Sequence, residues 1–334
     1  MNYYFAPMEG ITGYLFRNIH AEQFPGADRY YSPFLSANHN YSFQNKEKRD
    51  VAPENNRSTN LVPQLLTKQA DEFVWGALEL ARAGYSEINL NLGCPSSTVA
   101  SKGKGSGFLA DPEGLDRFFD RTFELLARPE TIHSRKADPS AGKEGENIPA
   151  VPRISVKTRI GYADAGEALP LMRIFNRYPI SELIIHARVR TAMYKGVPDI
   201  ETFSEMYAIR EIPVAYNGDV YTKEDAEKMQ KLFPDLSGIM CGRGAIADPA
   251  LIRECRGGEP LTFAEWKTFH DRLAAAYFGQ YSERIAIGRM KELWYYWERL
   301  FPGEERAVLT VKKARDRMSY TAAVNMLIRE HLPA

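Results

Sequence analysis

Short apolar runs recur along the first three-quarters of the chain, and a polar or glycine-containing turn follows each of them. Runs of about four to eight residues that are rich in β-branched and aromatic side chains and end at a turn are typical of buried strands. Eight segments fit this description: Tyr3–Pro7, Asp28–Phe34, Asn60–Leu66, Glu87–Leu92, Arg153–Thr158, Glu182–Ala187, Pro213–Asn217 and Ser237–Gly242.

Amphipathic helical patterns lie between most of these runs, and three are clear, at residues 68–84, 111–127 and 222–233. Asp111 and Pro112 form a helix start in the second, and Thr222 with Asp225 forms a capping box in the third. Repeated alternation of strand and helix predicts a parallel sheet closed as a (β/α)8 TIM barrel. An open doubly wound sheet is the alternative, but eight strands within about 250 residues favour the barrel.

Two stretches depart from this rhythm. Ser134–Arg153 is rich in Pro, Gly, Lys and Glu and is expected to be an exposed insertion. After about Gly257 only helical patterns follow, at residues 263–281, 283–301 and 310–332. We therefore expect a barrel domain over residues 1–256 and a smaller all-α domain over residues 257–334.

Composition narrows the class of protein. The chain has 43 Lys and Arg residues and 43 Asp and Glu residues, so any basic surface for a nucleic acid must be local. Its three cysteines, Cys94, Cys241 and Cys255, are too few and too scattered for a disulfide scaffold or a zinc site. Neither a membrane span nor a signal peptide is evident, so we expect a cytoplasmic protein.

Candidate chemistry is expected at the carboxyl ends of the strands, where barrels of this kind carry their sites. Glycine turns follow the seventh and eighth predicted strands, as Asn217-Gly218-Asp219 and Gly242-Arg243-Gly244. A single glycine sequence of this kind is more often only a turn, but two at consecutive strand ends favour phosphate binding. The other strand ends carry Pro7, Met8, Glu9, Gln64, Asn91, Cys94, Lys157, Arg159, His186 and Arg188.

Two of these side chains are unusual for their positions. Lys157 lies in an otherwise apolar strand, where an unpaired cation is costly, so a functional role is favoured over an ammonium that merely reaches the rim. Cys94 follows a strand and precedes Pro95, whereas the other two cysteines are interpreted as inert buried thiols.

The segment after Cys94 is rich in glycine. Residues 103–107 read GKGSG, and we expect a lid that folds over a ligand, with Lys102 and Lys104 placed to meet phosphates. We also expect only one of Asn89 and Asn91 to face the barrel interior.

These motifs resemble those of the tRNA-dihydrouridine synthases, flavin enzymes that reduce the C5–C6 bond of uridines in tRNA. The resemblance rests on NLGCPSSTV with GKGSGFL after it, ISVKTRIG, HARVRTAMYKG, YNGD and CGRGAI. It extends from APMEGITGYLFR to the helical RMKELWYYW and so covers nearly the whole chain. No single motif would suffice, but the set together is specific.

The resemblance implies a barrel that holds FMN, with NADPH or NADH as reductant, and a helical domain that binds tRNA. It implies that flavin N5 passes a hydride to uracil C6 and that Cys94, matching the catalytic cysteine, gives a proton to C5. The expected substrate-binding residues are Asn91, Lys102, Lys104 and Arg188. The expected cofactor-binding residues are Pro7, Met8, Glu9, Gln64, Lys157, His186, Asn217, Gly218, Asp219, Gly242 and Arg243.

Two other functions stay open at this point. A flavin barrel that reduces a free small molecule is disfavoured by the helical tail and by the Lys102 and Lys104 segment. A tRNA-binding barrel without redox chemistry is disfavoured by the presence of Cys94 and Lys157. Basic residues at 312–317 are either a solvated helix face or a local surface for tRNA, and the resemblance favours the second. We expect a monomer.

Overall fold

The computed structural model of the chain describes residues 1–37, 39–128 and 150–329. Within them, nine parallel strands form one sheet in the order β3-β2-β1-β9-β8-β7-β6-β5-β4. The first and last members of this order, β3 (Leu61–Val62) and β4 (Gln64–Leu65), are two halves of one predicted run. Pro63 separates them because proline has no N–H to donate to a neighbouring strand. The chain itself therefore joins the two ends of the sheet, and the predicted (β/α)8 barrel is confirmed.

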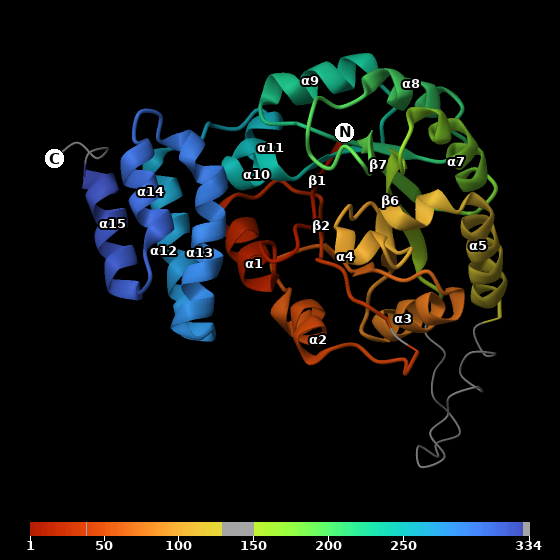
Figure 1. The fold of residues 1–334 in the computed structure, drawn as a ribbon, viewed down its shortest axis with the longest axis horizontal. Helices are drawn as coiled ribbons and strands as arrows, with labels where there is room; N and C mark the ends of the chain where they lie inside the picture. Colours follow the sequence, from red (N-terminus) through yellow and green to blue (C-terminus); the bar gives the residue numbers. More distant parts are fainter. Residues whose placement is uncertain (38, 129–149, 330–334) are drawn as a thin grey trace, which may run out of the picture.

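All eight predicted runs contain strands. The remaining ones are β1 (Asn2–Phe5), β2 (Arg29–Tyr31), β5 (Glu87–Leu92), β6 (Arg153–Gly161), β7 (Glu182–Val189), β8 (Val214–Asn217) and β9 (Gly238–Cys241). Helices cover their outer side in Figure 1: α1 (Tyr14–Gln23), α2 (Asn45–Val51), α3 (Ala70–Arg82), α5 (Pro112–Leu126), α7 (Ala168–Phe175), α8 (Ile200–Ala208) and α9 (Lys223–Leu232). The short α4 (Ser97–Ala100) lies instead in the segment between β5 and α5.

The predicted helix starts are also confirmed. The Asp111 carboxylate accepts a hydrogen bond of 2.9 Å from the Gly114 N–H, and Thr222 and Asp225 form the expected capping box. The Ser134–Arg153 insertion lies, up to residue 149, outside the described residues.

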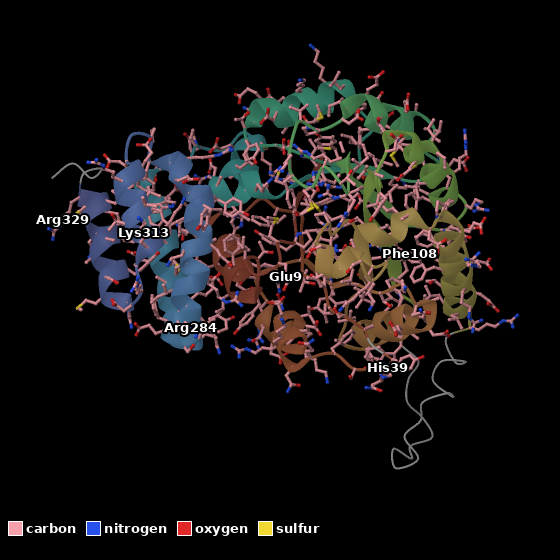
Figure 2. All side chains as sticks on the ribbon, viewed as in Figure 1. Glu9, His39, Phe108, Arg284, Lys313 and Arg329 are labelled. Atoms are coloured by element: carbon pink, nitrogen blue, oxygen red, sulfur yellow. The ribbon has the colours of Figure 1, made fainter. Side chains whose placement is uncertain are left out.

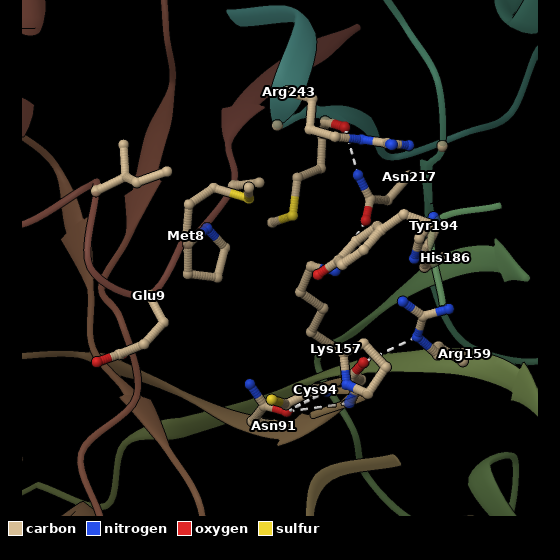
Figure 3. Close-up of a pocket in the computed structure, with 18 of the residues that line it drawn as sticks. Met8, Glu9, Asn91, Cys94, Lys157, Arg159, His186, Tyr194, Asn217 and Arg243 are labelled. Carbon is tan, nitrogen blue, oxygen red and sulfur yellow. Dashed lines mark hydrogen bonds between the residues drawn. The ribbon is translucent and has the colours of Figure 1, made fainter. Parts of the chain in front are cut away.

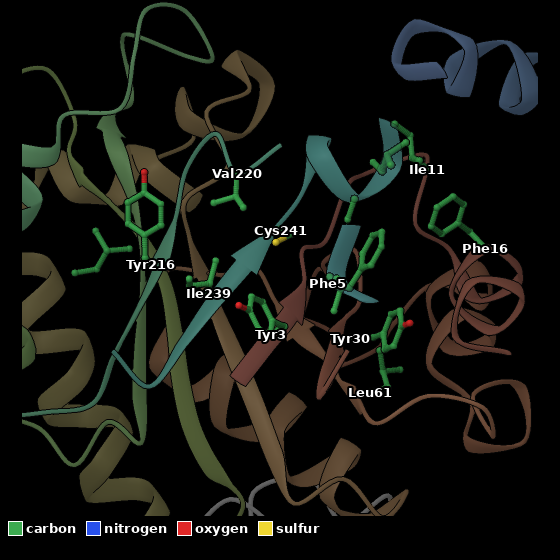
Figure 4. Packing of buried hydrophobic residues seen from close by; sticks show 14 of the residues in the cluster. Tyr3, Phe5, Ile11, Phe16, Tyr30, Leu61, Tyr216, Val220, Ile239 and Cys241 are labelled. Atoms are coloured by element: carbon green, nitrogen blue, oxygen red, sulfur yellow. The ribbon is translucent and has the colours of Figure 1, made fainter. Parts of the chain in front are cut away.

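Alternation along each strand separates two cores. Tyr3 and Phe5 of β1 belong to the large core between the strands and the helices, as Figure 4 shows, whereas Tyr4 belongs to a small core inside the barrel. Met240 lies inside the barrel in the same way, and Cys241 lies outside it. Strand residues two apart share a face, so each row of inward-facing side chains continues along its strand. These rows are apolar within the barrel and polar at the carboxyl ends of the strands.

The chain after β9 is helical wherever it is described. Two short helices, α10 (Arg243–Ala247) and α11 (Leu251–Cys255), lead into α12 (Phe263–Gln280), α13 (Glu283–Trp297), α14 (Glu305–Lys313) and α15 (Arg317–Arg329). The last four form a bundle at one end of the molecule in Figure 1. The predicted domain boundary at residues 256 and 257 falls between α11 and α12. None of the described helices is long and apolar enough to cross a membrane.

Buried tryptophans hold this bundle together and join it to the barrel. Trp266, Trp294 and Trp297 are each at most 1 % exposed and contact one another edge to face. The Trp297 indole N–H donates a 3.0 Å hydrogen bond to the Ile246 carbonyl of α10. The Trp266 indole N–H has no acceptor among the described residues. The two rings are therefore equally buried but differ in one hydrogen bond.

This difference gives a paired test of how the bundle is attached. We expect Trp297→Phe to lower the free energy of unfolding by about 1–3 kcal/mol more than Trp266→Phe, because only the first leaves a buried carbonyl without its donor. Urea unfolding followed by circular dichroism measures both variants. Equal losses would show that the Trp297–Ile246 hydrogen bond contributes nothing beyond ring packing.

Candidate functional site

One cavity of about 430 Å³ opens at the carboxyl ends of the strands. Its lining brings together most of the predicted residues: Pro7, Met8, Glu9, Gln64, Asn91, Cys94, Lys157, His186, Asn217, Gly218, Asp219, Gly242 and Arg243. Figure 3 shows Met8 and Glu9 on one side of this space and Arg159, His186 and Tyr194 on the other. Lys102, Lys104 and Arg188 are not among the lining residues.

The loop that carries Cys94 is held by the side chain of Asn91. The Asn91 amide oxygen accepts hydrogen bonds from the backbone N–H groups of Gly93 at 3.0 Å and Cys94 at 2.9 Å. These two hydrogen bonds hold the loop against the carboxyl end of β5. Burial raises the pKa of the half-buried Cys94 thiol. The thiol therefore stays protonated at neutral pH and is available as an acid.

Asn91 is itself oriented by a chain of side-chain hydrogen bonds inside the barrel. Its amide N–H donates to Gln64 at 2.6 Å, Gln64 donates to Asn89 at 2.7 Å, and Asn89 donates to the Ser155 hydroxyl at 3.0 Å. The expectation that only one of Asn89 and Asn91 faces the interior is wrong. Both face it, because residues two apart in a strand lie on the same side. The Gln64 side chain is fully buried and uses both its oxygen and its nitrogen in this chain.

The glycine-rich segment after Cys94 is not the lid that we expected. Residues 105–110 form a short 3-10 helix, and Gly105 to Leu109 are buried. The Ser106 N–H and hydroxyl both donate to the Cys94 carbonyl, at 3.2 and 2.7 Å. A Cβ added at Gly107 would lie 2.3 Å from the Ala100 carbonyl oxygen. The glycines permit close packing against the Cys94 loop, and the Ser106 hydrogen bonds hold the loop in addition to those of Asn91.

Arg159, expected at a strand end but given no role in the sequence analysis, is also a residue of this site. It is 1 % exposed and donates to the carbonyl oxygens of Gly93 at 2.9 Å, Val189 at 3.0 Å and Met193 at 2.8 Å. Its guanidinium therefore joins the Cys94 loop to the loop after β7. The ring of Tyr194 from that loop lies 5.4 Å from the guanidinium and lines the cavity. The basic Lys157-Thr158-Arg159 pattern in an apolar strand was the available signal for Arg159.

Lys157 is a cation at the wall of the cavity without a carboxylate partner in the described part of the chain. Its ammonium donates to the Asn217 side-chain oxygen at 2.8 Å, and Asn217 in turn donates to the Met240 carbonyl. Burial, with the nearby Arg159, lowers the pKa of Lys157 to about 7. Near neutral pH the Lys157 amine is therefore only partly protonated, and an electron-rich group placed beside it would favour the charged form.

Asp219 organises the cations at the other end of the cavity. Its carboxylate pairs with Arg188 and, at 2.5 Å, with Arg243. Arg188 is 2 % exposed and also donates to His186 Nε2 at 3.2 Å. Since arginine can only donate, Nε2 must be the unprotonated nitrogen of His186. Burial and the surrounding cations lower the His186 pKa well below its usual value, so the ring is neutral with its proton on Nδ1.

The helical bundle also reaches this cavity. Tyr296 of α13 is one of its lining residues, next to Trp297, which is bonded to the barrel. No pattern in the sequence placed Tyr296 here, because it lies 53 positions beyond Arg243, the last barrel residue of the predicted set.

The fold and the site define a parallel (β/α)8 barrel with a cavity lined by basic side chains and a half-buried thiol at the carboxyl ends of its strands. The family model for dihydrouridine synthase (Dus) matches residues 4–144 and 145–287. The chain belongs to the dihydrouridine synthase family, as the motif resemblance predicted, and it is an oxidoreductase.

Relatives named for this activity match along most of the chain. A tRNA-dihydrouridine(16) synthase from Cupriavidus necator is 27% identical over 327 residues, covering 94% of this chain and 94% of the relative. One of the same name from Ralstonia nicotianae is 26% identical and covers 93% of this chain and 91% of the relative.

Solved structures support the fold. The old yellow enzyme from Trypanosoma cruzi superposes with a TM-score of 0.52 at 9% identity, covering 82% of this chain and 93% of that one. An old yellow enzyme homologue from Zymomonas mobilis gives a TM-score of 0.51 at 12% identity, with 79% and 92% covered.

The hydrogen bonds of Asn91 predict its contribution to the Cys94 loop. We expect Asn91→Ala to lower the free energy of unfolding by about 1–3 kcal/mol, because two backbone N–H groups lose their acceptor. We also expect faster alkylation of Cys94 by iodoacetamide, with Cys255 as the internal control, measured by peptide mass spectrometry. An unchanged Cys94 rate would mean that the loop is held by the Ser106 and Arg159 contacts alone.

Proposed function

We propose that this protein reduces the C5–C6 double bond of a uridine in tRNA, with FMN as its bound cofactor and NADPH or NADH as its reductant. The observation that carries the proposal is the Cys94 thiol, kept protonated by its partial burial, on the wall of the cavity that the Lys157 amine also lines. The family assignment and the activity for which the relatives are named support the same reaction.

The residues present fit a flavin. Lys157 is half-buried and its acceptor is a neutral amide, so it would hold the electron-rich pyrimidine edge of the ring. Gln64 is oriented toward the same wall, although its described hydrogen bonds already engage both ends of the amide. Gly218, Asp219, Gly242 and Arg243 line the far part of the cavity and would hold the phosphate. When bound, the flavin supplies the hydride that reduces uracil at C6.

The remaining chemistry belongs to the chain. Cys94 delivers a proton to uracil C5, which completes the addition of a hydride and a proton across the double bond. Its loop is held on both sides, by Asn91 and by Ser106, so the thiol needs little reorganisation to act. Arg159 and Lys157 add positive charge beside it, which favours the thiolate that remains after transfer.

A tRNA substrate requires that the uridine leave the base stack, since the thiol lies within a cavity and not on an open surface. The helices of residues 257–334 are the proposed tRNA-binding part, and Lys102, Lys104 and Arg188 stay proposed contacts to the RNA. Lys102 is exposed outside the cavity, as a backbone contact would require, whereas Arg188 is buried and held by Asp219. Because the two relatives above are named for position 16, we propose uridine 16 as the target.

The decisive experiment maps dihydrouridine in tRNA from cells with and without this protein, and with the Cys94→Ala variant. We expect dihydrouridine at position 16 only with the unsubstituted protein, and purified Cys94→Ala should keep its flavin but lose turnover on tRNA by at least roughly a hundredfold. Full turnover by the variant would remove the acid role. Turnover on free uridine without RNA would favour a small-molecule reductase, and a protein that takes up no flavin would favour a binding function alone.

The lowered pKa of Lys157 predicts how flavin binding depends on pH. An electron-rich ring edge raises the pKa of the ammonium from about 7, so above that pH the complex holds a proton that the free protein lacks. Flavin affinity should therefore fall as pH rises above about 7, by up to tenfold per pH unit, and stay flat just below it. Fluorescence quenching of the flavin measures this affinity. Lys157→Met should bind more weakly and lose the slope; a slope retained by Lys157→Met would assign it to another group.

A further inference from the structure

A second cavity, of about 290 Å³, adjoins the first and is not used by the reaction described above. The two share Glu9, Pro33 and Phe34 in their walls, so a ligand in one can continue directly into the other. Figure 2 shows Glu9 in the region between the barrel and the C-terminal helices. The second cavity is completed by residues from both sides: Tyr14, Lys46, Arg49 and Asp50 from the barrel, and Tyr281 and Arg289 from the bundle.

The wall of the second cavity contains aromatic rings and basic side chains that lie close to one another. The Arg289 guanidinium lies 4.6 Å from the centre of the Tyr281 ring and donates to the Gly10 carbonyl at 2.9 Å. Its Nε is buried and has no acceptor among the described residues. Arg49 donates to the Tyr14 hydroxyl at 2.9 Å. Lys46 is exposed at the start of α2.

The carboxylates of the same wall are largely occupied. Asp50 is paired with the buried Arg17 at 3.0 Å and also accepts from the Tyr14 N–H. Glu47 accepts from the backbone N–H groups of Ser36 and Gln44, which closes the start of α2. Glu9, the third carboxylate of the wall, lies near Lys46 and Arg289 and offsets part of their charge, so the lining is close to neutral. The unpartnered Arg289 Nε and the rings of Phe34 and Tyr281 still favour a ligand that carries a flat ring and a hydrogen-bond acceptor such as a phosphate.

We propose that this second cavity binds the nucleotide next to the target uridine in the tRNA, with its base against Tyr281 and Phe34 and its phosphate near Lys46 and Arg289. The inference rests on the proposed function. Extruding the uridine into the first cavity breaks its stacking with its neighbour, and that neighbour then needs another aromatic partner. The second cavity supplies one at the position where the RNA chain leaves the first.

The test combines a change in the protein with a change in the RNA. Binding of a tRNA transcript is measured by fluorescence anisotropy for the unsubstituted flavin-loaded protein and for Tyr281→Ala. Each is also tested with transcripts that carry an abasic residue on the 5′ or the 3′ side of the target uridine. We expect Tyr281→Ala to weaken binding of the intact transcript by roughly tenfold to a hundredfold. One abasic transcript should weaken binding to the unsubstituted protein similarly, and the two losses should not multiply when combined.

Several controls keep the result specific. Tyr281→Phe keeps the ring and should lose at most a few-fold in affinity. Lys46→Ala should lower the dependence of binding on salt by about one phosphate contact, whereas Lys231→Ala, an exposed lysine of α9, should leave it unchanged. The lysine pair tests the proposal even where Tyr281→Ala does not fold.

The outcomes separate this inference from the proposed function. Losses that multiply for both abasic transcripts, or equal salt dependence in the two lysine variants, would overturn the second nucleotide site while leaving the reaction intact. A raised KM for the nicotinamide reductant in Tyr281→Ala, with tRNA binding unchanged, would assign the cavity to the reductant and overturn the inference. If the unsubstituted protein forms no dihydrouridine in tRNA, the proposed function fails first, and the inference fails with it.

Discussion

The side-chain amide of Asn91 sets where the Cys94 thiol lies. It accepts from two consecutive backbone N–H groups as the chain leaves β5, and it is turned toward them because its own nitrogen must donate to Gln64. An amide can satisfy both demands in only one orientation, whereas a carboxylate at this position would have no donor for Gln64. The position of the thiol is thus specified from the barrel interior, through Gln64, Asn89 and Ser155 on three strands.

The charges of the cavity follow a second constraint, the shortage of carboxylates. Asp219 is shared between Arg188 and Arg243, so Lys157 and Arg159 are held by neutral oxygens of amides and carbonyls. A buried arginine beside a half-buried lysine, with no counter-charge, is costly for the folded protein, and this cost lowers the pKa of Lys157. An electron-rich ring or a phosphate in the cavity would offset that cost.

The barrel could be predicted from the sequence because the hydrophobic patterns of strands and of helices are each visible within a short stretch of chain. Strand runs ended by turns, with helix caps at Asp111 and Thr222, need no tertiary information. The strand ends likewise converge by topology alone, which is why thirteen of the predicted residues line one cavity. The prediction was wrong where the packing of neighbouring segments determines the local structure. GKGSG was interpreted as a mobile lid from composition, but glycine serves equally for close approach, and Gly107 lies directly on the Ala100 carbonyl. The role of Arg159 was not predicted, and Tyr194 and Tyr296 were missed, because their contacts depend on loops and helices distant in sequence.

The helical bundle has a direct part in the site, which its attachment explains. Trp297 is bonded to α10, the helix that begins at Arg243 immediately after the last strand. The same turn of α13 places Tyr296 in the first cavity, and two turns earlier Arg289 bonds to Gly10 at the wall of the second. One helix thus contacts both cavities while hydrogen bonds to barrel carbonyls hold it at its middle, through Arg289, and at its carboxyl end, through Trp297. A shift of the bundle relative to the barrel would move both cavity walls together, so whatever the bundle binds is coupled by geometry to the groups around Cys94.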